Sequence, residues 1–309
     1  MKKALFLIKM FCISGVVIIP GNTFAQMDDY YYEECYYHGG CESSSSDAAT
    51  DAIVENVVQS DFDSTFTADA TSIGQEAAAE GFDLIGFVLR YGIFKHGDLD
   101  VKSLSLPLSY TFQFENSGDK LKLKLPLGMV DVEGSKAYKV GLGMDYGWKV
   151  TDKWRLTPSL NFNFVKSDDF NSDGQLASGL LTSTYAFELG KYKLHMGNMV
   201  GYYRSMSFSG DQYDPDISNT VVKNGFMMAI PMRNVASWEL FVTDTRYFGT
   251  DLYIDQYNEI GFSFGYKKAE KDPVTSKIKK YFKYLRAGIT YMYASGDSNG
   301  FSFNFGYSF

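Results

Sequence analysis

From residue 82 to the C-terminus, apolar and polar residues alternate with a period of two. In the stretch SLSLPLSYTFQF, Leu104, Leu106 and Leu108 share one face with the aromatics that follow, and small or polar residues share the other. The next stretch, KLKLKLPLGM, repeats the pattern with leucines against lysines. Successive side chains of a strand point to opposite faces. The period therefore predicts strands with one apolar and one polar face.

The alternation divides into twelve segments that are long for strands of soluble proteins, in which about 5–6 residues is usual. A strand that crosses a bilayer at a tilt needs about 9–11 residues. An even number of such strands can close without edges, as lipid requires. We therefore predict an all-β fold, a 12-stranded antiparallel transmembrane β-barrel over residues 81–309. The expected strands are 82–94, 101–114, 119–130, 136–150, 153–166, 175–189, 191–208, 217–230, 235–246, 252–266, 281–294 and 299–309.

The connections between these segments are of two kinds. Tight turns such as ENSG (115–118) and Thr151-Asp152 alternate with longer, acidic connections such as SDDFNSDG and SGDQYDPDIS. Outer-membrane barrels have short periplasmic turns and longer outer loops. We expect an integral protein of the cell outer membrane, with both ends of the barrel on the periplasmic side.

The N-terminus has the pattern of an export signal. Lys2, Lys3 and Lys9 precede a short apolar stretch, and small residues end at Ala25. This predicts a signal peptide over residues 1–25, since the apolar run is too short for a membrane anchor. Cys35 and Cys41 are close enough in sequence to form a disulfide in an oxidising periplasm.

Residues 26–80 differ in character from the rest of the chain. They contain 13 acidic residues and no Lys or Arg, so the net charge of −8 comes from this segment. Its tyrosine- and serine-rich start is of low complexity. We expect a largely disordered or short-helical acidic N-terminal extension.

The last residues resemble a known assembly signal. Phe301, Phe303, Phe305, Tyr307 and Phe309 alternate with small or polar residues, which resembles the C-terminal signal of outer-membrane proteins. With twelve strands and a helix-prone segment before them, the chain resembles the translocator barrel of autotransporters, in particular solitary barrels with no large passenger. The resemblance implies outer-membrane lipid, the barrel-assembly machinery and periplasmic chaperones as partners. It implies no nucleic acid, and it leaves any further protein partner open.

The polar face carries a row of lysines, Lys120, Lys122 and Lys124, at about 6–7 Å spacing along one strand. These charges repel each other unless they are countered. The counter-charges are either carboxylates of the lumen, or the acidic extension entering the pore as a plug. The candidate carboxylates are Asp145, Glu188 and Glu239.

Candidate catalytic and metal-binding residues are few. His195 has the parity of the lumen face, and His96 is expected in an outer loop beside Asp98 and Asp100, with no serine partner. Asp169, Asn171 and Asp173 match the start of a calcium loop, but Leu180 stands where the closing Glu belongs. We expect that the protein is not an enzyme and has no cofactor. We also expect that the acidic loop tips are solvated and hold no metal ion.

Three functions remain open at this point. The first is a structural or interaction role for a solitary barrel with an occluded pore. The second is a narrow diffusion channel for small solutes, with the lysine row favouring anions. The third is an outer-membrane hydrolase with its site at the outer rim.

Overall fold

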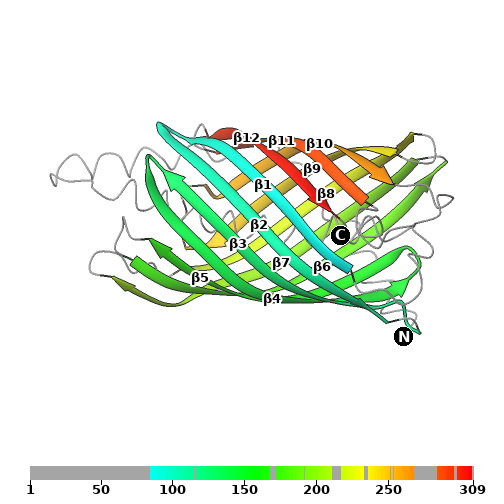
Figure 1. Cartoon of the computed structure of the whole chain (residues 1–309), viewed down its shortest axis with the longest axis horizontal. Helices are drawn as coiled ribbons and strands as arrows, with labels where there is room; N and C mark the ends of the chain where they lie inside the picture. Colours follow the sequence, from blue (N-terminus) through cyan, green and yellow to red (C-terminus); the bar gives the residue numbers. More distant parts are fainter. Residues whose placement is uncertain are drawn as a thin grey trace, which may run out of the picture. The chain divides into compact units, whose positions relative to one another are not determined.

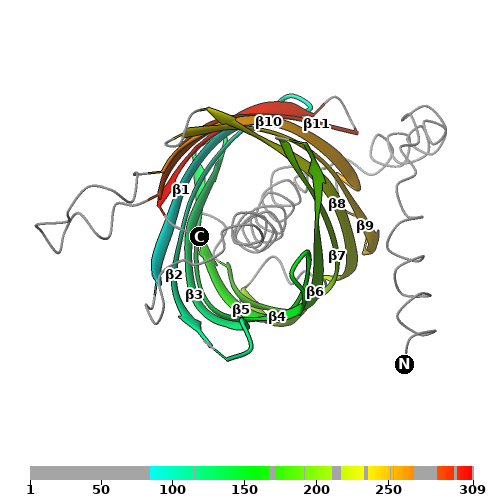
Figure 2. The same ribbon diagram turned by 90° about the vertical axis from the view of Figure 1, so that its right-hand side faces the viewer.

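The strands form one closed sheet. The computed structural model describes residues 84–307 apart from 115, 168–171, 191, 211–216, 233–235, 251, 253, 268–283 and 296–297. Every strand pairs antiparallel with its neighbours along the chain, and β1 pairs with β12 (Figures 1 and 2). The strands are β1 (Leu84–His96), β2 (Leu99–Gln113), β3 (Lys120–Val132), β4 (Ser135–Thr151), β5 (Trp154–Ser167), β6 (Ser172–Leu189), β7 (Tyr192–Gly210), β8 (Ser218–Met232), β9 (Ala236–Gly249), β10 (Gln256–Lys267), β11 (Tyr284–Ala294) and β12 (Asn299–Tyr307). The predicted 12-stranded antiparallel barrel is confirmed.

The expected signal peptide (1–25) and acidic extension (26–80), with Cys35 and Cys41, lie outside the described residues. Among the described residues, no helix is long and apolar enough to cross a membrane.

The two faces of the barrel differ as the alternation predicts. Outward side chains are apolar and exposed, as at Leu142 (64 %), Leu160 (62 %) and Ile260 (62 %). Inward side chains include polar and charged groups that are almost completely buried, such as Asn163 (1 %) and Lys223 (0 %). This is the arrangement that lipid outside and a polar lumen inside require.

We call the end at which β1 passes into β2 the loop end, and the opposite end, where β1 starts and β12 finishes, the termini end. At the termini end, the β2–β3 turn is closed by two backbone hydrogen bonds, from the Phe114 N–H to the Asp119 carbonyl (3.0 Å) and from the Gly118 N–H to the Phe114 carbonyl (2.9 Å). Gly118 has φ +73°, which suits glycine. The predicted tight turn is therefore present.

The β3–β4 connection at the loop end is shorter than expected. It is a two-residue turn in which Glu133 and Gly134 both have positive φ, as a hairpin with the twist of its strands requires. The Gly134 N–H donates to the Asp131 carboxylate (2.9 Å), and the Asp100 N–H donates to Glu133 Oε1 (2.6 Å). These contacts explain why β3 and β4 extend beyond the expected bounds into what was predicted to be a longer loop.

The starts of β6 and β10 also differ from the expectation. β6 begins at Ser172, three residues early, and a register shift at Gln175 and Leu176 accommodates the longer strand. β10 begins at Gln256 and not at residue 252. Ile254, before β10, is only 4 % exposed and packs in a buried apolar cluster. Its apolar character therefore reflects packing into the barrel and not membership of the strand.

Several aromatic side chains are exposed on the outward face, where interfacial girdles form. Trp148 (54 %), Tyr202 (46 %) and Tyr293 (53 %) are exposed. Trp154, the first residue of β5, is by contrast only 4 % exposed. Its indole N–H donates to Ser183 Oγ (3.0 Å), which holds the ring against the wall.

Candidate functional site in the barrel lumen

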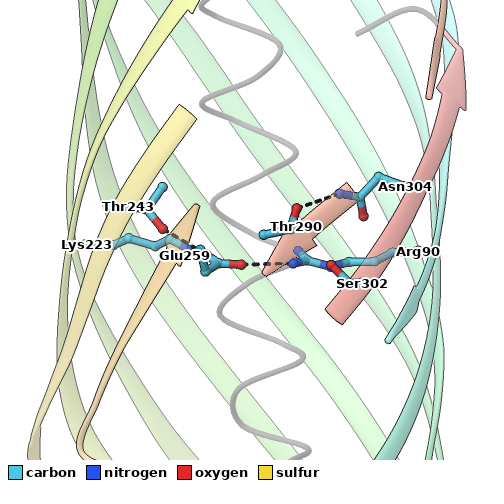
Figure 3. A network of polar contacts seen from close by, with 7 residues as sticks. All are labelled: Arg90, Lys223, Thr243, Glu259, Thr290, Ser302 and Asn304. Carbon is cyan, nitrogen blue, oxygen red and sulfur yellow. Dashed lines mark hydrogen bonds and ion pairs between the residues drawn. The ribbon is translucent and has the colours of Figure 1, made fainter. Parts of the chain in front are cut away.

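The lumen contains a buried network of charges around Glu259. This carboxylate lies on β10 and accepts three hydrogen bonds from neighbouring walls (Figure 3). Lys223 Nζ on β8 is 2.7 Å away, Thr243 Oγ1 on β9 is 2.9 Å away, and Arg90 Nη2 on β1 is 2.9 Å away. Arg90 Nε also donates to Ser302 Oγ on β12 (3.2 Å). One carboxylate thus ties the consecutive strands β8, β9 and β10 to β1, which lies far from them in the chain.

The charged groups of this network are hidden from water. The side chains of Arg90, Lys223 and Glu259 are 8 %, 0 % and 2 % exposed. Lys223 Nζ also lies 5.3 Å from the centre of the Tyr257 ring, within the range of a cation–π contact. Buried charges are tolerated only when they are paired and hydrogen-bonded, and here two cations share one anion. Sequence reasoning missed this network, although charged residues at inward positions of β1, β8 and β10 were a visible signal.

A second ion pair lies nearer the termini end. Glu239 on β9 accepts hydrogen bonds from Arg286 on β11 and from Ser263 Oγ on β10 (2.7 Å). Glu239 was proposed as a counter-charge of the lysine row, but its charged partner is Arg286. Glu188, the other distant candidate, pairs with Lys153 at 3.5 Å in an exposed position. Neither residue is on a strand adjacent to β3, which explains the difference.

The lysine row lies on the wall formed by β3, β4 and β5. Lys122 and Lys124 are buried (8 % and 5 %) and Lys120 is half-buried. Lys124 Nζ is 2.7 Å from Asp145 Oδ1 on β4, so one of the proposed lumen carboxylates does counter the row. Lys139 and Arg155 add two further buried cations to the same wall.

Glycines of β4 make room for the long polar side chains of this wall. A Cβ at Gly143 would be 2.3 Å from Asn161 Oδ1 and 2.8 Å from Lys124 Cε. A Cβ at Gly141 would be 2.3 Å from Asn163 Oδ1. The asparagines of β5 therefore lie flat over the bare backbone of β4, which no strand with side chains at those positions would allow.

An apolar cluster lies on the lumen face, concentrated toward the loop end. Its members come from β1–β3 and β6–β11 or lie just before one of these strands, and they are at most 7 % exposed. They include Phe94 and Val101, which are cross-strand neighbours, and Tyr203, Val221 and Met292. We call this set of buried residues the apolar layer. The lumen is thus divided between an apolar part and a polar, charged part.

The two described histidines do not form a catalytic arrangement with the residues expected beside them. His195 is 2 % exposed and faces the lumen, where its cross-strand neighbours are Ala186 and Met227. His96 is the last residue of β1 and is buried (2 %), so the expectation of a loop position was wrong. Asp100 pairs with Lys95 at 3.9 Å in an exposed position.

Of the three candidate calcium residues, only Asp173 lies among the described residues. Asp169 and Asn171 lie outside the described residues, and Asp173 lies in β6, opposite Lys166, and not in a loop. Leu180 faces the lumen and is 7 % exposed. Within the described part of the chain, no group of three or more His, Cys, Asp or Glu residues is arranged to hold a metal ion.

Three residues of the expected assembly signal lie on the outward face of the closing strand. Phe301, Phe303 and Phe305 are 48 %, 52 % and 42 % exposed. Tyr307 ends β12 opposite Phe87 of β1, and Phe309 lies outside the described residues. Pairing with both β1 and β11 makes β12 the strand that closes the barrel.

No protein-family model matches this chain, and no curated protein matches it. Solved structures do. The β domain of the Bordetella autotransporter BrkA superposes with a TM-score of 0.52 at 15 % identity, over 75 % of this chain and all (100 %) of that one. The translocator domain of autotransporter NalP from Neisseria meningitidis gives 0.52 at 13 % identity, over 82 % of this chain and 98 % of that one. At such identities the likeness concerns the fold: the chain is a barrel of the outer-membrane kind that resembles autotransporter translocator domains.

Proposed function

We propose that this protein is a solitary outer-membrane barrel of the translocator type, whose pore is occluded and whose role is structural or interactive. The observation that carries the proposal is the apolar layer. Apolar constrictions stop ions by excluding water from the path. Side chains from nine of the 12 strands, or from residues next to these strands, contribute to the apolar layer. The layer therefore extends around most of the circumference of the lumen.

The acidic extension is the second element of this proposal. Among the described residues, the buried charges of the lumen wall are six cations (Arg90, Lys122, Lys124, Lys139, Arg155 and Lys223) and three anions (Asp145, Glu239 and Glu259). A segment with 13 acidic residues and no basic residue complements this excess. We propose that residues 26–80 enter the lumen from the termini end and close it together with the apolar layer.

Single-channel recording in planar bilayers tests this proposal. The full mature chain is expected to show little conductance, and deletion of residues 27–80 is expected to raise it. A matched control keeps the length of the segment and replaces its Asp and Glu residues with Asn and Gln, which isolates the contribution of charge. Unchanged conductance after the deletion overturns the plug, and high conductance of the full chain overturns occlusion as a whole.

The excess of lumen cations also favours a second function, a narrow diffusion channel for small anions. With 12 strands, the lumen is wider than the filled lumen of an eight-stranded barrel and narrower than the channel of a 16-stranded porin. In this case the full chain conducts and selects anions, and Lys122→Gln lowers that selectivity. The same recordings therefore separate the two functions by the conductance of the full chain.

We infer that the protein is not an enzyme. His195 has Ala186 and Met227 beside it, so the neighbouring strands offer it neither a nucleophile nor an orienting carboxylate at those positions. Incubation of the refolded protein with phospholipid and peptide substrates tests this inference. Hydrolysis that is lost in a His96→Ala or His195→Ala variant would contradict it.

The remaining proposals concern topology and assembly. We propose that the termini end faces the periplasm, supported by the two-residue β4–β5 and β6–β7 connections at that end and the longer β7–β8 and β9–β10 connections at the loop end. We also propose that a signal peptide is removed after Ala25 and that the barrel-assembly machinery and periplasmic chaperones handle the chain. Proteolysis of intact cells tests the orientation, because cleavage within residues 26–80 from outside would show that the extension reaches the surface.

A further inference from the structure

The outward face of β7–β10 carries a row of polar residues where the rest of the pattern is apolar. Asn198, Asn224, Asp244 and Asn258 are direct cross-strand neighbours. The alternation places them outward, since Met199 and Lys223, next to them in sequence, are buried inside the barrel (3 % and 0 %). We call these four residues, with Arg246 and Gln256, the polar stripe.

Hydrogen bonds link five of the six residues of the polar stripe. Asn198 Nδ2 donates to Asn224 Oδ1 (2.7 Å). Arg246 Nε donates to Asp244 Oδ2 (3.1 Å), and Gln256 Nε2 donates to Asp244 Oδ1 (3.3 Å). The side chains of Arg246 and Asp244 remain 26 % and 27 % exposed. They therefore present polar atoms to whatever lies against the outside of the barrel.

Apolar residues border the polar stripe. Toward the termini end, the adjacent outward row is Met196, Phe226, Val242 and Ile260, again in direct register. Toward the loop end on β7 and β8, the adjacent row is Val200 and Val222, followed by Tyr202 and Thr220. At Asn198 and Asn224 the polar stripe thus lies inside the apolar band and not at its rim. Polar groups in hydrocarbon are costly unless another polar surface covers them.

We propose that the polar stripe is the surface against which a second copy of this chain packs in the membrane. The argument is its charge balance. The polar stripe has one carboxylate, one guanidinium and carboxamides, so it is neutral and offers both donors and acceptors. An anionic lipid headgroup is recognised by clustered basic residues, whereas a two-fold interface requires a surface that complements itself.

The centre of the polar stripe fits a two-fold axis between two copies. This axis runs parallel to the barrel, outside it, and faces the boundary between β8 and β9. Asn224 and Asp244 are cross-strand neighbours on these two strands. Such an axis therefore sets Asn224 of each copy against Asp244 of the other. A carboxamide N–H then meets a carboxylate on both sides of the axis. Arg246, two residues further along β9, has the length to reach the opposing carboxylate.

Disulfide cross-linking in membranes tests the interface directly. Asn224→Cys, in a chain with Cys35→Ser and Cys41→Ser, is expected to give a disulfide-linked dimer on oxidation. The matched control is Leu142→Cys, because Leu142 faces outward on β4 and is 64 % exposed. The control is expected to stay monomeric. Equal cross-linking of both variants, or none of either, overturns the proposal.

A second measurement does not depend on engineered cysteines. The mass of the protein in detergent is expected to be that of a dimer for the natural chain, and that of a monomer for the Asn224→Leu and Asp244→Leu double variant. A folded barrel is recognised by its altered gel mobility without heating, which separates loss of the dimer from loss of the fold. If the double variant does not fold, the cross-linking pair decides. A folded double variant that stays dimeric, or a natural chain that is a monomer with bound anionic lipid, refutes the interface.

Discussion

The charge network around Glu259 allows a prediction whose magnitude follows from the structure. In the variant Glu259→Gln, the carboxylate that Arg90 and Lys223 share is replaced by an amide of the same shape. The two cations remain buried, at 8 % and 0 % side-chain exposure, without their shared anion. The glutamine N–H₂ group must also point at one of two groups that only donate hydrogen bonds.

Removal of one partner of a buried ion pair costs about 3–5 kcal/mol. We therefore expect Glu259→Gln to lower the free energy of unfolding by about 3–5 kcal/mol. Thr243→Val removes only one hydroxyl donor to the carboxylate and should cost about 1.5–3 kcal/mol. The matched control is Glu188→Gln, in which the same substitution breaks an exposed pair with Lys153 and should cost at most about 1 kcal/mol.

A triple variant separates the cost of the unpaired charges from the loss of packing. Arg90→Met and Lys223→Met, combined with Glu259→Gln, remove both cations while keeping apolar volume in their place. Replacement of a whole buried ionic group by apolar residues is often neutral or stabilising. The triple variant is therefore expected to regain most of the stability that Glu259→Gln alone loses.

The assay is equilibrium unfolding in urea of the barrel folded in lipid vesicles, followed by the fluorescence of its three tryptophans. The free energy of unfolding is expected to be lowest for Glu259→Gln, higher for Thr243→Val and highest for Glu188→Gln. If Glu259→Gln is no less stable than Glu188→Gln, the network does not hold β1, β8, β9 and β10 together. If the triple variant is as unstable as the single one, the cost does not come from unpaired charge.

Three further predictions concern other parts of the barrel. Burial raises the pKa of Asp119, but hydrogen bonds from the Lys149 N–H, Ser117 and Tyr146 outweigh it and hold the pKa below its usual value. The contribution of Asp119 to the free energy of unfolding is thus complete above the unfolded pKa of about 3.9 and is lost as pH falls through the lower folded pKa. In Asp119→Asn, the free energy of unfolding should therefore depend less on pH in that acid range. Gly249→Ala should cost about 1–3 kcal/mol of stability, since its φ is +140° and a Cβ would lie 2.1 Å from a backbone oxygen. The control is Gly179→Ala, because a Cβ there would lie 3.7 Å from its nearest neighbour. In the same urea titration, this control should change the stability by no more than about 0.5 kcal/mol. Deletion of Phe309 should cause poor assembly and periplasmic degradation, and normal outer-membrane levels of that variant on immunoblots would argue against an assembly signal.

The strands could be predicted from the sequence because the environment of each strand is uniform along its length. Lipid outside and a polar lumen inside impose the period of two, which the stretches around Leu104 and Lys122 display directly. The ends of the strands were less predictable, since they depend on turn chemistry. Because both φ angles of the Glu133-Gly134 turn are positive, β3 ends later, and β4 starts earlier, than the alternation of apolar and polar residues predicted.

The contacts in the lumen could be predicted only where they are local. Lys124 and Asp145 lie on the two strands of one hairpin, β3 and β4, and their pairing was among the expectations. Arg90 and Glu259 are 169 residues apart in sequence. They meet because the barrel closes through β12 and β11, and because the shear of the barrel brings those positions to one level. Register and shear are properties of the whole closed sheet, so no local pattern could indicate that contact.

The excess of cations on the lumen wall leads to one last prediction about the acidic extension. Like charges at close range repel one another, and repulsion in a confined lumen is strongest when little salt is present. If residues 26–80 supply the compensating charge, deletion of residues 27–80 should lower the stability of the barrel to urea, and added salt should restore part of the loss. A neutralised extension with Asn and Gln in place of its acids should behave like the deletion. Equal stability of all three chains at low salt would show that the wall compensates its own charge, and the conductance of the deletion variant would then report on the apolar layer alone.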